Sequence, residues 1–144
     1  MRNTVPRPIL LLQLVAGLMD STTGILLVAA PLFTLRLMRI ESIPPSGSFV
    51  AFVGAFVLGV GLTYLWVLVR YTRGLTTAAD WEAQWRDTAI IRAVVAVGLL
   101  IQILEGRMGI AWISVVATDG GLAILQALGL WRRWLHPVER ARLG

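Results

Sequence analysis

The sequence contains no cysteine and one histidine, His136, among its 144 residues. The absence of cysteine excludes a disulfide framework, a thiolate zinc site, a cysteine-held iron–sulfur cluster and a covalently attached c-type haem. A single histidine cannot supply both axial ligands of a bis-histidine haem. A histidine-based catalytic triad would have to use His136, which lies in a polar tail. We therefore expect no metal site and no catalytic residues of the soluble-enzyme type.

Charge is also scarce: charged residues make up 15% of the chain, whereas a typical soluble domain has about 25%. Hydrophobic residues make up 57%. This composition argues against disorder and against an ordinary soluble globular domain. Lysine is absent, so the 13 basic residues are all arginine, and the net charge is +5. These arginines flank apolar runs, as they do in membrane proteins, and we expect no nucleic-acid partner.

Four apolar runs fill most of the chain, at about 9–34, 49–69, 88–105 and 109–131. A bilayer core about 30 Å thick needs about 20 residues of helix. The third run is short, but it extends backward through a helical segment at about 78–87, which we place at the membrane interface. The first run is longer than the apolar region of a signal peptide, so we expect it to be retained. The prediction is one all-α domain, an antiparallel bundle of four transmembrane helices.

Short connections and small residues indicate how these helices pack. The loop at about 105–108 is so short that the third and fourth spans must form a tight antiparallel hairpin. Thr76 or Thr77 can cap the helix that leads into the third span. Three glycines of the second span are expected to let helices approach closely: Gly54, Gly59 and Gly61.

Arginine placement predicts the orientation of the four spans. With four spans, the two ends of the chain and the second loop share one side. That side carries Arg2, Arg7, Arg70, Arg73, Arg86, Arg132, Arg133, Arg140 and Arg142. The other side carries Arg36, Arg39 and Arg107. By the positive-inside rule both termini are cytoplasmic, and the expected location is the cytoplasmic (inner) membrane.

Three charged residues interrupt the apolar runs: Asp20, Arg92 and Asp119. Burying such a charge in hydrocarbon costs at least about 2.5 kcal/mol, so each needs a partner or a function. At 1.5 Å per residue, Asp20 lies about 16 Å from the cytoplasmic edge and Asp119 about 15 Å from the outer edge, which places both near the midplane. Arg92 can reach them. Uncharged polar residues at nearby depth complete the candidate ligand or proton site: Tyr64, Gln13 and Gln126.

Three interpretations of this cluster remain open. The charges can form a structural salt bridge that fixes the helix register. They can form a ligand or proton site, because two acids and one arginine leave a net charge of −1 when all are ionised. They can also contact a partner subunit.

A set of short segments stands out along the chain: Gly17–Asp20, Gly24–Leu27, Ala30–Pro31, Leu58–Leu65, Arg86–Arg92 and Asp119. Together they resemble the DoxX-like small four-helix membrane proteins of bacteria and archaea. The resemblance implies a four-helix membrane fold and association with redox complexes. One branch of the family resembles the quinone-reducing membrane subunit of thiosulfate oxidation. The family offers no agreed set of functional residues, so none is carried over.

We therefore expect an accessory or quinone-interacting subunit of a redox-associated membrane complex, without independent catalytic activity. The cofactor that this interpretation implies is quinone. The alternatives are a small homodimeric proton-coupled transporter or channel and a purely structural or assembly subunit. The expected partners are the lipid bilayer and either redox-complex subunits or a second copy of the chain.

Overall fold

The computed structural model describes residues 5–40 and 47–135, and His136 lies outside them. The described residues are almost entirely helical and contain no strand. The helices are α1 (Arg7–Ala29), α2 (Pro31–Leu37), α3 (Gly47–Thr72), α4 (Ala78–Leu104) and α5 (Ile113–Trp131), and a 3-10 turn, η1 (Ile110–Trp112), precedes α5.

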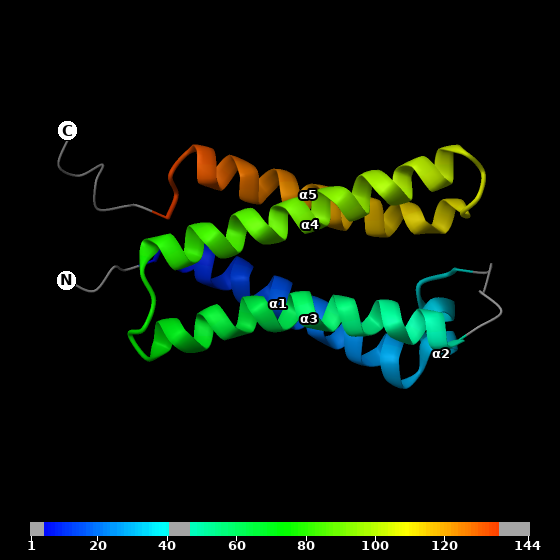
Figure 1. The fold of residues 1–144 in the computed structure, drawn as a ribbon, viewed down its shortest axis with the longest axis horizontal. Helices are drawn as coiled ribbons and strands as arrows, with labels where there is room; N and C mark the ends of the chain where they lie inside the picture. The colour runs from blue at the N-terminus through cyan, green and yellow to red at the C-terminus, as the bar shows by residue number, and fades with distance from the viewer. Residues whose placement is uncertain (1–4, 41–46, 136–144) are drawn as a thin grey trace.

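The four long helices form two hairpins (Figure 1). Helix α1 packs along α3, and α4 packs along α5. Among the described helices, Cα atoms of the two hairpins come within 8 Å of each other only between α3 and α4. Side chains therefore fill most of the space between the hairpins. The start of α1 and the end of α5 lie at the same end of the bundle (Figure 1).

Glycines allow α1 and α3 to pack with their backbones in contact. A Cβ atom added to Gly24 would lie 2.4 Å from the Leu58 backbone nitrogen, and one added to Gly61 would lie 2.5 Å from the Ser21 nitrogen. Gly54 is equally tight against the opposite helix. The expectation for Gly59 is wrong, because a Cβ atom there would meet nothing within 4 Å. It lies on a different face of α3.

The first apolar run does not form one helix to residue 34 as expected. Helix α1 ends at Ala29, and Ala30 has φ −143° and ψ 63°, outside the helical region. Pro31 then begins the short helix α2. The proline ring disfavours helical backbone at the preceding residue, which accounts for the break.

Helix α4 joins the expected interfacial segment and third span into one continuous helix. It begins with a capping box, in which the Thr77 hydroxyl accepts a hydrogen bond from the Asp80 backbone N–H and the Asp80 carboxylate accepts one from the Thr77 N–H. These bonds satisfy donors that a helix start would otherwise leave unpaired. Trp81 and Trp85, one turn apart, are both buried in an apolar cluster with Ile9.

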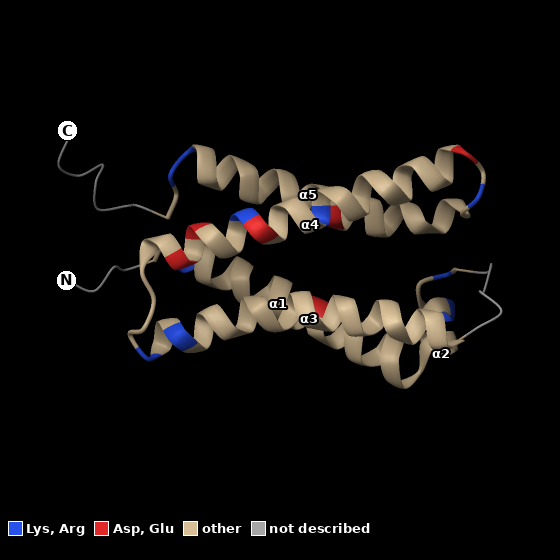
Figure 2. Cartoon of the chain, viewed as in Figure 1, with Lys and Arg blue, Asp and Glu red and all other residues tan. Residues whose placement is uncertain are grey.

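Four helical stretches are long and apolar enough to cross a membrane, which confirms that part of the prediction. They are Arg7–Ala29, Gly47–Thr72, Ala78–Leu104 and Ile110–Trp131. Large apolar side chains cover their outward faces; Phe56, Val94 and Leu104 are 65%, 68% and 77% exposed. Charged residues gather mainly toward the ends of the bundle, with a small group halfway along it (Figure 2).

Candidate functional site

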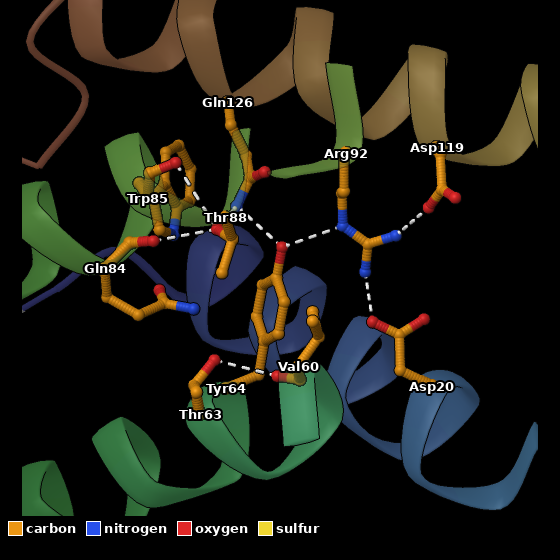
Figure 3. A network of polar contacts seen from close by, with 10 residues as sticks. All are labelled: Asp20, Val60, Thr63, Tyr64, Gln84, Trp85, Thr88, Arg92, Asp119 and Gln126. Atoms are coloured by element: carbon orange, nitrogen blue, oxygen red, sulfur yellow. Dashed lines mark hydrogen bonds and ion pairs between the residues drawn. The ribbon is translucent and has the colours of Figure 1, made fainter. Parts of the chain in front are cut away.

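One arginine connects the two hairpins at mid-height. The guanidinium of Arg92, on α4, donates to the carboxylates of Asp20 on α1 and Asp119 on α5. Its Nε donates to the Tyr64 hydroxyl on α3 over 3.1 Å. Arg92 is only 3% exposed. A single buried side chain thus binds to all the other long helices (Figure 3).

Tyr64 links this charged group to a layer of neutral polar side chains. The Gln126 amide, on α5, donates to the Tyr64 hydroxyl over 2.8 Å and to the Thr88 hydroxyl over 2.9 Å. The Thr88 hydroxyl in turn donates to the Gln84 backbone carbonyl over 2.8 Å. The Tyr64 ring also lies beside the Arg92 guanidinium, 5.4 Å from its centroid to the guanidinium carbon.

Gln13 forms a second bridge between the hairpins. Its amide nitrogen donates to the Gln84 side-chain oxygen over 2.9 Å and to the Tyr64 backbone carbonyl over 3.3 Å. Its amide oxygen accepts a hydrogen bond from the Trp85 indole over 3.0 Å. Gln13 itself is fully buried. Each end of its amide is therefore held by α4.

The structure brings the six candidate residues into one connected network. The sequence reasoning missed three further members, all on α4: Gln84, Trp85 and Thr88. Their positions relative to Arg92 follow helical spacing, with Thr88 one turn and Gln84 two turns before it. That spacing could have revealed them. Gln84 and Trp85 fall in the segment expected at the membrane interface, where polar side chains need no protein partner, and Thr88 is the first residue of the expected third span.

The network lies between two apolar clusters. One contains Ile9, Val67 and the buried tryptophans of α4, and the other contains Leu27, Leu35 and Val50. Polar groups in such surroundings are stable only when they are paired, and Arg92 pairs with both carboxylates. The arrangement can hold the hairpins in register, and it places hydroxyl, amide and guanidinium donors close together.

Within residues 5–40 and 47–135, no group of three or more His, Cys, Asp or Glu side chains is arranged to hold a metal ion. The two acids of the network are already engaged by Arg92.

Comparisons with known proteins return no match: no family model, no curated protein and no solved structure is similar to this chain.

Proposed function

We propose that the protein is a four-span protein of the cytoplasmic (inner) membrane with both termini in the cytoplasm. The length and apolar character of its four long helices support this location. So do the large apolar side chains on their outward faces. The orientation rests on the arginine bias of the sequence, which favours the end of the bundle where α1 begins and α5 ends.

We further propose that it is an accessory subunit of a redox-associated membrane complex and that it interacts with quinone. The observation that carries this proposal is the buried group formed by Arg92, Tyr64 and Gln126, which concentrates hydrogen-bond donors between apolar helices. A quinone ring needs such donors for its carbonyl oxygens and an apolar setting for its tail. The resemblance to the DoxX-like family points in the same direction.

Gentle native purification, with bound proteins and quinones identified by mass spectrometry, tests this role. The expected result is co-purification of a dehydrogenase or oxidase subunit together with quinone. Asp20→Asn and Asp119→Asn, singly and combined, are expected to lower quinone content. Glu105→Gln is the control, because that acid is exposed and lies outside the network. A chain that purifies without quinone or a redox partner would contradict the proposal.

A structural or assembly role is the second candidate, because the almost fully buried Arg92 side chain is bound to Tyr64, Asp119 and Asp20, one residue on each of the other long helices. On this alternative the Asp20 and Asp119 variants lose stability but keep the activity of any partner complex. Unfolding measurements and activity measurements on the same variants separate the two roles.

A further inference from the structure

A groove of about 540 Å³ lies between α3 and α4, on the seam between the two hairpins. Phe56, Gly59 and Thr63 line it from α3, and Gln84, Asp87 and Ile91 line it from α4. Two members of the polar network, Gln84 and Thr88, are among its lining residues, whereas the six candidate residues are not. Its volume falls within the range of about 300–1,000 Å³ that is typical of small-molecule sites.

Beside this groove, one fully buried donor has no partner among the described residues. Gln84 is 9% exposed, and its side-chain oxygen accepts the hydrogen bond from Gln13. Its amide nitrogen has no hydrogen-bond partner among the described residues. In Figure 3 this amide extends from α4 toward the part of α3 that carries Thr63. A buried N–H group without an acceptor is costly, so a ligand oxygen that accepts from it would be favoured.

The floor of the groove is open at Gly59. A Cβ atom built at this position meets nothing within 4 Å, whereas Gly54 and Gly61 on the same helix are pressed against α1. Gly59 is therefore not required for helix packing. Its lack of a side chain leaves space inside the groove.

The groove is polar at one end and apolar at the other. Gln84 marks the polar end of the groove, which lies toward the start of α4, about 12 Å or eight residues before Arg92. Asp87, beside it, has a side chain that is 67% exposed. Phe56 and Ile91 line the groove further from the start of α4. A molecule with an oxygen acceptor near Gln84 and an apolar tail along Phe56 and Ile91 matches this gradient.

We propose that this groove binds a single-tailed membrane amphiphile whose carbonyl oxygen accepts a hydrogen bond from the Gln84 amide. The inference rests on the membrane location proposed above and not on the quinone role. A quinone ring carbonyl and a lipid ester carbonyl share this chemistry, and the experiment below distinguishes them.

Native mass spectrometry of the full chain in detergent tests the proposal with two probes, decylubiquinone and monoolein. Gly59→Leu fills the groove and is expected to remove bound probe to background. Gly98→Leu is the matched control, since Gly98 is also an exposed helical glycine whose Cβ would meet nothing within 4 Å. Gln84→Glu keeps an acceptor for Gln13 but lacks the amide donor, and it should weaken binding about two- to tenfold, the range of one neutral hydrogen bond.

Each outcome separates this inference from the quinone role. Binding of either probe that is lost in Gly59→Leu and kept in Gly98→Leu supports the groove. If monoolein behaves so and decylubiquinone does not bind at all, the quinone role fails while the groove stands. If decylubiquinone binding survives Gly59→Leu but is lost in Asp20→Asn/Asp119→Asn, the quinone role is supported, and the groove stands only if monoolein binding is lost in Gly59→Leu and kept in Gly98→Leu. Binding of neither probe, or equal loss of binding in both glycine variants, overturns the groove.

Discussion

Replacing Arg92 with methionine should destabilise the fold severely. The change leaves the Asp20 and Asp119 carboxylates without their cation, and their side chains are only 9% and 18% exposed. Removing one partner of a buried ion pair costs about 3–5 kcal/mol, because a charge remains buried without compensation. Arg92 serves two acids, so the upper part of this range is expected. At about 1.4 kcal/mol per decade, the ratio of folded to unfolded protein falls by roughly three orders of magnitude.

The assay is unfolding by sodium dodecyl sulfate in mixed micelles, followed by tryptophan fluorescence. Trp81 and Trp85 are buried and should report the opening of the structure around them. Arg86→Met is the matched control, since Arg86 is on the same helix with a side chain 65% exposed and should cost about 0–1 kcal/mol.

A triple variant tests whether the orphaned charges cause the loss. Asp20→Leu/Arg92→Met/Asp119→Leu removes all three charges, and buried ion pairs replaced by apolar residues are often tolerated or even stabilising. It should therefore recover most of the stability lost in Arg92→Met. A cost below about 1 kcal/mol for the single variant, or a triple variant less stable than the single one, would refute the reasoning.

Three further changes probe other parts of the structure by the same unfolding assay. Gly24→Ala places a methyl group against the backbone of α3 and should lower the free energy of unfolding by about 1–3 kcal/mol. Gly59→Ala places it in open space and should change that free energy by no more than about 0.5 kcal/mol. Equal effects would contradict the close packing of α1 and α3. Tyr64→Phe should cost about 1–3 kcal/mol by leaving two buried donors without their acceptor, and an unchanged unfolding midpoint would show that the hydroxyl is dispensable. Thr77→Ala should cost about 1 kcal/mol through loss of the helix cap, and Thr76→Ala, its neighbour, should cost much less.

The charged centre of the network could be anticipated from sequence because burial in an apolar run is costly. Asp20, Arg92 and Asp119 each needed a partner, and helical rise placed both acids near the midplane, within reach of the long Arg92 side chain. The structure brings the three together. Their role as a ligand or proton site stays a prediction.

The polar residues at the start of α4 could not be assigned in the same way. Gln84 and Thr88 carry no charge, and a position near the membrane surface gives them an obvious partner in water. Helical spacing places them on the same side of α4 as Arg92, but their burial and their bonds to Gln13 and Gln126 depend on how α4 packs against α1 and α5.

Composition also could not distinguish one glycine of α3 from another. Gly59 and Gly61 are two residues apart and therefore point in nearly opposite directions around a helix with 3.6 residues per turn. Gly61 meets Ser21, whereas Gly59 faces open space. Which face meets α1 depends on the partner helix. The break before Pro31, by contrast, can be predicted from the proline, because a proline disfavours helical backbone at the residue before it. A first helix that continues unbroken to residue 34 disregards this effect.

The division into two hairpins has a consequence for biosynthesis. Asp20 and Arg92 are 72 residues apart, and each belongs to a different hairpin. At about 5–20 residues per second, a ribosome makes the arginine about 4–14 s after the aspartate. In the proposed membrane setting, Asp20 therefore stays in the first hairpin without its arginine partner during that interval. Each hairpin is a contiguous half of the chain, so the ion pair between Asp20 and Arg92 can form only after most of both halves has been synthesised.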